Sequence, residues 1–151
     1  RPRAKGIFTL DERYSQHLMM ATVTGVVPYI SILHSYLHDL RSGHKFYVLL
    51  GASYADELAY DKELQEMAQA HPDYIAFVPT VSRPREERNH GWEGETVRVN
   101  TLLEKYVAKL ALDRDDTLIY ACGHPGMIED VKVRAAALDF LVQEERFWKV
   151  S

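Results

Sequence analysis

Short apolar runs alternate with longer amphipathic stretches along this chain, and that alternation limits the possible folds more than any other feature. A short apolar run bounded by turn residues is typical of a buried strand, and an amphipathic stretch between two such runs is typical of a crossover helix. Repeated strand-helix-strand units with right-handed crossovers build a parallel sheet that has helices on both faces. The sequence therefore predicts an α/β domain with a five-stranded parallel sheet in a three-layer arrangement.

The expected strands cover 17–21, 46–51, 74–80, 117–121 and 147–150, and 6–10 is a further short strand candidate. The expected helices cover 28–40, 56–70, 99–112 and 125–143. Proline at position 28 suits the first turn of a helix, and Pro72 ends the second helix because the residue before a proline avoids the helical region. The remaining long segment, 82–96, is loop-like, and a loop of that length in a compact domain is usually functional.

Composition sets the class of protein. The 151 residues are 46% hydrophobic and 26% charged, as expected for one globular domain, and the formal net charge of -4 argues against nucleic-acid and anionic-membrane partners. The single cysteine, Cys122, excludes an internal disulfide, a four-cysteine zinc site and a cysteine-ligated iron-sulfur cluster, and favours a cytoplasmic location. No apolar run has membrane-spanning length. The start at Arg1, within a linker-like segment, suggests a piece of a longer protein.

Ligands of open parallel sheets bind beyond the carboxyl ends of the strands, so the residues that follow each strand are the candidate site. Small and hydroxylic residues at 21–25 lead into a helix start that favours phosphate, although an ordinary capped turn is an equal alternative. Ser82, Arg83 and Arg98 suit a ribose 2'-phosphate, although the many charges of this loop also fit a solvated cluster. The segment 122–127 lets a flat ring approach the backbone.

Together these strand ends resemble the nucleotide domain of the ferredoxin-NADP reductase family over essentially the whole chain. The family's T-G-T-G-I-A-P-[FY] segment is matched at 22–29, its A-D-E-L-x-Y segment at 55–60, its V-[ST]-R segment at 81–83, and its C-G-x-P-x-M segment at 122–127. The resemblance implies a Rossmann-like NAD(P)-binding domain over 17–151. It also implies that 1–16 is a linker and edge segment from a flavin-binding domain upstream in the same polypeptide.

The resemblance implies hydride transfer between NADPH and FAD, with ferredoxin or flavodoxin as the electron partner, and a chain that is inactive without its flavin half. It places Cys122 at the catalytic position beside the nicotinamide, where the flavin does the chemistry and the protein supplies geometry. Its cofactor-binding residues are Thr22, Thr24, Gly25, Pro28, Ser53, Ser82, Arg83, Arg98, Gly123, His124, Pro125, Met127 and Trp148. Covalent catalysis by the thiol is not expected, because no partnered base is evident, and a buried small hydrophobic side chain is the alternative for Cys122.

Three positions depart from the family pattern. Val23 and Val97 replace glycines, and Ser53 stands where bacterial members often carry an arginine. A valine in the first turn weakens nucleotide binding or rearranges the turn, because positive φ is unfavourable for a branched side chain. Two alternatives therefore stay open: an NADH-using reductase component of an oxygenase system, and a domain that kept the fold but lost nucleotide binding.

Two other features carry less weight. His34 and His38 have helical spacing that suits a metal, but no completing ligand is near, so surface histidines are expected and no metal site is predicted. Phe147 and Trp148 either supply aromatic cover for the flavin or pack in the core.

Overall fold

The computed structural model describes residues 11–39 and 42–146. Its strands form one parallel sheet in the order β3-β2-β1-β4-β5, where the bounds are β1 (Gln16–Thr22), β2 (Lys45–Ala52), β3 (Ile75–Val81), β4 (Thr117–Gly123) and β5 (Leu141–Arg146). The α-helices are α1 (Val27–His38), α2 (Asp61–Ala70), α3 (Leu103–Lys109) and α4 (Pro125–Ala137). Four 3-10 turns complete the described elements: η1 (Val23–Val26), η2 (Ala55–Glu57), η3 (Glu87–Asn89) and η4 (Val99–Leu102).

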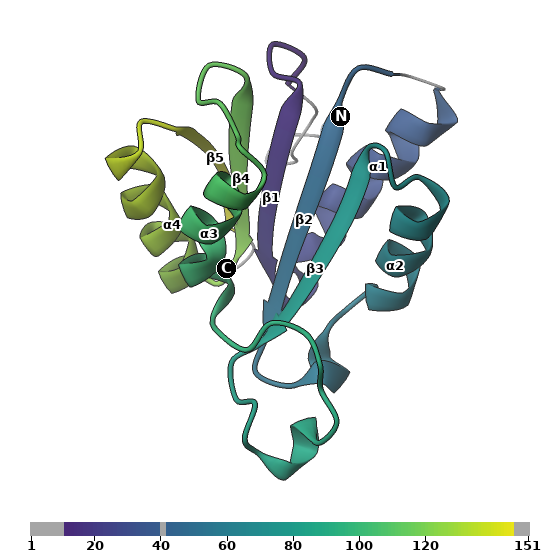
Figure 1. Ribbon diagram of the computed structural model, residues 1–151, viewed down its shortest axis with the longest axis vertical. Coiled ribbons are helices and arrows are strands. Elements are labelled where there is room, and N and C mark those ends of the chain that lie inside the picture. The colour runs from purple at the N-terminus through teal and green to yellow at the C-terminus, as the bar shows by residue number, and fades with distance from the viewer. Residues whose placement is uncertain (1–10, 40–41, 147–151) are drawn as a thin grey trace.

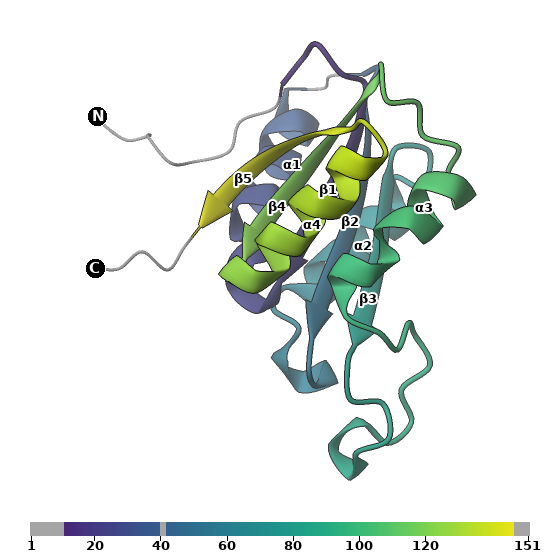
Figure 2. The same cartoon turned by 90° about the vertical axis from the view of Figure 1, so that its left-hand side faces the viewer.

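The sheet lies between two layers of helices, with α1 and α2 on one face and α3 and α4 on the other (Figures 1 and 2). Side chains of β1 alternate between the two cores, as a central strand of a parallel sheet requires. Met19 and Ala21 pack in the α1 and α2 layer, whereas Leu18 and Met20 pack in the α3 and α4 layer. The predicted five-stranded, three-layer α/β fold is confirmed.

Parallel pairing brings the carboxyl ends of the strands to one edge of the sheet. At the end of β1, Thr22 pairs with Gly51 of β2, and Ala21 pairs with Cys122 of β4. The long segment between β3 and η4 extends beyond this edge in both views (Figures 1 and 2). The edge, called the carboxyl edge below, is where the predicted site residues belong.

The last predicted helix was too long and the last predicted strand was misplaced. The helix expected over 125–143 ends at Ala137, and the fifth strand follows it as β5, where a helix end was expected. The strand expected at 147–150 lies outside the described residues, as do Trp148 and the 6–10 strand candidate.

Local geometry explains this end of α4. Asp139 adopts a left-handed conformation, with φ of 66°, and the N–H of Phe140 donates to the carbonyl of Ala135 at 2.9 Å. Together with a bond from the Asp139 N–H to the Ala136 carbonyl at 3.1 Å, this bond forms a Schellman-type helix end with aspartate in place of the usual glycine. Phe140 is thereby buried in the core, and pairing with β4 outweighs the helix propensity of 143–146.

The starts of two further helices were also predicted wrongly. The helix expected from position 56 begins at Asp61, because Tyr60 adopts a left-handed φ of 61° after the short η2 turn. The helix expected over 99–112 begins as the 3-10 turn η4 and continues as α3. This helix ends at Lys109, shortly before Ala111, whose left-handed φ of 53° does not continue a helix. None of the described helices is long and apolar enough to cross a membrane.

Candidate functional site

A cavity of about 400 Å³ opens at the carboxyl edge of the sheet. Its walls come from the ends of β1 and β2, from the residues that directly follow β3 and β4, from η1 and η4, and from the start of α4. Six of the predicted site residues line it, namely Thr22, Ser53, Ser82, Arg98, His124 and Met127. Residues that lie more than a hundred positions apart in the chain, such as Thr22 and Met127, therefore meet in one concavity, as ligand sites of open α/β sheets do.

The ends of β1 and β4 are joined by a hydrogen bond. The backbone N–H of His124 donates to Oγ1 of Thr22 at 2.9 Å. Gly123 permits this contact, because its φ is 129° and a Cβ there would come within 2.2 Å of the Thr22 oxygen. Both positions therefore have a packing reason of their own, and their contact with a nucleotide stays a prediction.

Gly25 lies against the backbone of Cys122 and Gly123 at the end of β4. A Cβ at Gly25 would come within 2.5 Å of the Cys122 carbonyl oxygen, so a larger residue would force the η1 turn away from β4. Pro28 is buried in the first turn of α1. Neither residue lines the cavity. The backbone of Thr24 belongs to η1, and its side chain lies outside what the structure describes.

Val23 lines the cavity with a strained backbone. Its φ is 47°, in the left-handed region, and its side chain is exposed rather than held by the core. A β-branched residue with positive φ is a genuine outlier, because its side chain crowds the backbone. The turn therefore keeps a glycine-like conformation although the residue is valine. The replacement of the family glycine by Val23 is accommodated as backbone strain and not as a rearranged turn.

Val97 is accommodated without such strain. Its N–H and C=O both bond to Oγ1 of the buried Thr80, at 3.1 and 2.5 Å, and its side chain faces outward. It is not among the described residues with positive φ. The following residue, Arg98, lines the cavity and supplies a positive charge there.

The first turn of α4 forms another wall. Pro125 opens this helix, and Nδ1 of His124 caps it by accepting a hydrogen bond from the N–H of Gly126 at 3.0 Å. The positive end of the helix dipole makes such a helix start attractive to anions. Arg98 and the start of α4 thus give the cavity two positive features.

Cys122 has no exposed surface, and it packs in the core layer that contains Tyr29. The hydroxyl of Tyr29 donates to the Met20 carbonyl at 2.8 Å, and burial raises the pKa of this phenol. Cys122 therefore does not line the cavity in this structure, whereas its neighbours in sequence do. The catalytic position given to it by the family resemblance remains a prediction.

Arg83 is turned toward its own loop rather than toward the cavity. Its Nη1 lies 3.2 Å from Oε2 of Glu86, and this hydrogen bond raises the pKa of the guanidinium. Glu86 also accepts a hydrogen bond from the Tyr54 hydroxyl at 2.6 Å. The three residues are solvent-exposed or half-buried, so the arrangement is open to exchange with an incoming anion.

Two polar residues near the cavity had not been predicted. Asn100 lines it, and its Nδ2 donates to Oδ2 of Asp130 at 2.5 Å; this bond and a second one from Arg134 lower the pKa of the Asp130 carboxyl. The position of Asn100, two residues after Arg98 at a helix start, was a usable signal. Asn89 is buried in the charged loop, and no sequence motif marks it.

The histidines set aside in the sequence have ordinary partners. His34 pairs with Glu63 of α2, and His38 lies 3.3 Å from the carboxylate of Asp39. Within residues 11–39 and 42–146, no group of three metal-ligating side chains comes together.

Comparison with known proteins agrees with this geometry. Residues 19–133 match the family model of the oxidoreductase NAD-binding domain. The chain is 31% identical over 131 residues to the chloroplastic leaf isozyme 1 of ferredoxin-NADP reductase from Arabidopsis thaliana, an alignment that covers 81% of this chain and 35% of that protein. It is 31% identical over 128 residues to the flavodoxin/ferredoxin-NADP reductase of Buchnera aphidicola, covering 83% of this chain and 49% of the relative.

The fold comparison points the same way. A crystal structure of a ferredoxin NADP+ reductase from Neisseria gonorrhoeae with bound FAD and NADP superposes with a TM-score of 0.72 at 21% identity, covering 91% of this chain and 59% of the other. The chain thus spans between a third and a half of the length of the two curated relatives. It belongs to the oxidoreductase NAD-binding domain family, as a nucleotide-binding domain of the ferredoxin-NADP reductase type.

Proposed function

We propose that this chain binds NADP(H) at the carboxyl edge of its sheet, as the nucleotide-binding half of a flavin-dependent reductase. The observation that carries the proposal is the cavity itself, in which Arg98, Ser82 and Ser53 meet the start of α4. Guanidinium, hydroxyl and helix N-terminal groups are the donors that bind phosphates. The donor set of this cavity therefore fits a phosphorylated dinucleotide.

The donors are divided between two parts of the cavity. Thr22, Val23 and the start of α4 lie where the ends of β1 and β4 meet, and they suit the pyrophosphate. Ser53, Ser82 and Arg98 follow β2 and β3 and suit the 2'-phosphate of the adenosine ribose, with Arg83 nearby. None of these is an acidic side chain of the kind that would repel a 2'-phosphate.

The nicotinamide would lie beside 122–127, where Met127 and His124 reach the cavity. FAD, held mainly by a domain upstream in the same polypeptide, would accept a hydride from NADPH and pass electrons on singly. This chain's part is to orient the nicotinamide and its phosphates, since geometry is what the protein adds to cofactor chemistry. The names of the relatives support ferredoxin or flavodoxin as the electron partner. A cytoplasmic location stays a prediction.

Isothermal titration calorimetry with NADP+ and NAD+ tests the proposal. We expect NADP+ to bind more tightly than NAD+, and Arg98→Ala or Arg83→Ala to weaken NADP+ binding more than NAD+ binding, because only NADP+ carries the 2'-phosphate. Arg114→Ala is the matched control, since Arg114 is an exposed arginine paired with Asp139 and does not line the cavity.

Two other results would contradict the proposal. Tighter binding of NAD+ would favour an NADH-using reductase component. Failure of both nucleotides to bind at millimolar concentration would mean that the domain kept its fold and lost the ligand.

A further inference from the structure

Asn89 is buried within a loop of exposed charges. Only 2% of its surface is accessible, whereas Glu86, Glu87 and Arg88 beside it are exposed. A buried side-chain amide costs free energy unless its polar atoms find partners. The burial of Asn89 therefore indicates a specific set of hydrogen bonds.

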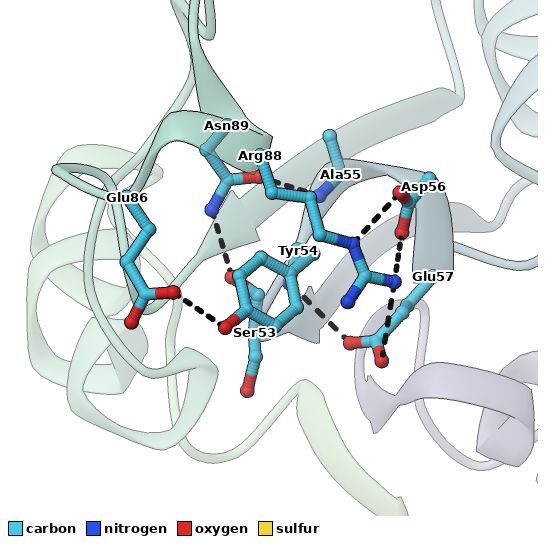
Figure 3. A network of polar contacts seen from close by, with 8 residues as sticks. All are labelled: Ser53, Tyr54, Ala55, Asp56, Glu57, Glu86, Arg88 and Asn89. Carbon is cyan, nitrogen blue, oxygen red and sulfur yellow. Dashed lines mark hydrogen bonds and ion pairs between the residues drawn. The ribbon is translucent and has the colours of Figure 1, made fainter.

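Three hydrogen bonds satisfy the amide, and each one goes to the backbone. Its Nδ2 donates to the carbonyl of Ser53 at 2.9 Å and to the carbonyl of Arg83 at 2.8 Å. Its Oδ1 accepts from the N–H of Ala55 at 2.8 Å. Figure 3 shows the amide between Ser53 and Ala55. One side chain thus cross-links the segment after β2 to the segment after β3.

The cross-link lies directly behind the proposed 2'-phosphate subsite. Ser53 and Ser82 line the cavity, and Arg83 follows Ser82 immediately. The segments that carry these side chains come from neighbouring strands, and a hydrogen bond from the Ser82 N–H to the Ala52 carbonyl at 3.0 Å joins them at the strand ends. Beyond that bond, Asn89 fixes the distance between them.

Two exposed contacts flank the amide, but they are weaker candidates for holding the segments after β2 and β3 together. Arg88 makes a two-pronged contact with Asp56 at 2.9 and 2.7 Å, and its guanidinium lies 4.1 Å from the ring centre of Tyr54 (Figure 3). Exposed ion pairs contribute little, because water competes for both charges. The buried amide is the element whose loss leaves backbone groups unsatisfied.

We propose that Asn89 is a positioning residue that sets the preference for NADP over NAD by fixing Ser53, Ser82 and Arg83 relative to one another. It touches no nucleotide, and it acts through the two backbones that it joins. The inference rests on the proposed NADP binding, since it concerns the 2'-phosphate subsite of that same cavity.

Asn89→Asp is the sharpest variant. It keeps an acceptor for the Ala55 N–H, but it places a carboxylate against the carbonyl oxygens of Ser53 and Arg83, which have then lost their donor. Calorimetry on the full 151-residue chain should show NADP+ affinity reduced about tenfold and NAD+ affinity changed about twofold or less. A tenfold change corresponds to the loss of roughly one hydrogen bond between the displaced subsite and the 2'-phosphate. Asn89→Ala removes the same donors without adding charge and serves where the aspartate variant does not fold.

Two controls separate positioning from general destabilisation. Phe140→Leu weakens the core away from the cavity, so it should lower the melting temperature without changing the ratio of the two affinities. A double-mutant cycle with Arg83→Ala tests the route of the effect. If Asn89 acts through Arg83, its substitution should cost less NADP+ affinity when Arg83 is already absent.

The outcomes distinguish this inference from the proposed function. Equal losses for NADP+ and NAD+ overturn the positioning role while leaving NADP binding intact. An unchanged NADP+ loss in the Arg83→Ala background excludes Arg83 from the residues that Asn89 positions. A wild-type chain that shows no preference for NADP+ overturns both proposals together.

Discussion

The backbone N–H of His124 donates to Oγ1 of Thr22 at 2.9 Å, and this bond ties the end of β4 to the end of β1. The two residues lie on either side of the place where the strand order reverses, because β1 pairs with β2 on one side and with β4 on the other. His124 also caps α4, so the same contact fixes where that helix starts. The position of one anion-attracting helix end thus depends on a threonine from a different strand.

Thr22→Val should therefore lower both stability and nucleotide affinity. Valine has nearly the same shape but leaves the His124 N–H without its acceptor, which costs about 1 kcal/mol in the free energy of unfolding. NADP+ affinity should fall several-fold because the start of α4 is no longer fixed. Urea unfolding and calorimetry measure the two effects.

Thr117→Val is the matched control at the other end of β4. The Thr117 hydroxyl is buried and finds no hydrogen-bond partner among the described residues, so valine at this position should not reduce stability. Equal losses of stability in the two variants would contradict the role of the Thr22 hydroxyl.

Val23→Gly should tighten the binding of both nucleotides. Val23 holds a φ of 47°, which costs a residue with a side chain about 1–2 kcal/mol and costs glycine little. Glycine also removes a branched side chain from the cavity wall. We expect unchanged or higher stability by urea unfolding, and lower dissociation constants for NADP+ and NAD+ alike.

Val97→Gly provides the comparison, because Val97 also stands at a family glycine but is not among the described residues with positive φ, and its backbone is bonded to Thr80. This substitution relieves no strain, so it should bring no gain in stability. A similar gain from both substitutions would mean that backbone strain at Val23 is not the cause.

Glu86→Gln should strengthen NADP+ binding selectively. In the structure the Glu86 carboxylate is paired with the guanidinium of Arg83. The pKa of the Glu86 carboxyl is lowered, mainly by the hydrogen bond from the Tyr54 hydroxyl and next by the one from Arg83. An incoming 2'-phosphate has to compete with this carboxylate for Arg83. Glutamine still accepts the Tyr54 hydrogen bond but competes less, so NADP+ affinity should rise a few-fold while NAD+ affinity stays constant.

Glu87→Gln is the charge-matched control, since Glu87 belongs to the same loop and Arg83 is bonded to Glu86 instead. If both glutamine variants raise NADP+ affinity equally, the effect comes from the net charge of the loop and not from release of Arg83. Calorimetry at low and high salt separates the two, because screening weakens the general effect first.

The sequence predicted the strand ends well because their signals are local. The ends of strands are marked by the end of an apolar run, by glycines next to hydroxyl residues, and by a proline where a helix begins. Parallel pairing then brings these strand ends together at one edge of the sheet. This is why Thr22, Ser82 and Arg98 line one cavity as expected. For Cys122 the motif left a buried small side chain open as an alternative, and only the packing of Cys122 in the core that contains Tyr29 of α1 decides for burial.

The parts that were missed depend on contacts between distant segments. Asn89 lies among exposed charges, and its burial arises only when the loop after β3 folds back onto the segment after β2. The fifth strand contains glutamine, glutamates and arginine that favour helix, and it forms because β4 offers an edge to pair with. Tertiary contacts decide such cases over local propensity.

His17, near the start of β1 at the end of the sheet opposite the cavity, makes the stability of the fold depend on pH. Its ring is fully buried, with Nδ1 2.7 Å from the Tyr120 hydroxyl and Nε2 3.0 Å from Nδ1 of His44, and it stacks on Phe46. Burial, and then the nearby His44, lower the pKa of His17 from 6.5 to about 4. The folded chain therefore binds fewer protons at this position than the unfolded chain between these two pH values.

Stability should accordingly fall as the pH is lowered from 6.5 toward 4, because protons favour the unfolded state over that range. The loss from this one group is about 2 kcal/mol between pH 7.5 and pH 5, given that one pKa unit is worth 1.36 kcal/mol. Urea unfolding at the two pH values measures it. In His17→Gln, which keeps a polar side chain that does not titrate, the loss over this range should shrink by about that amount; an unchanged pH dependence would show that other groups cause it.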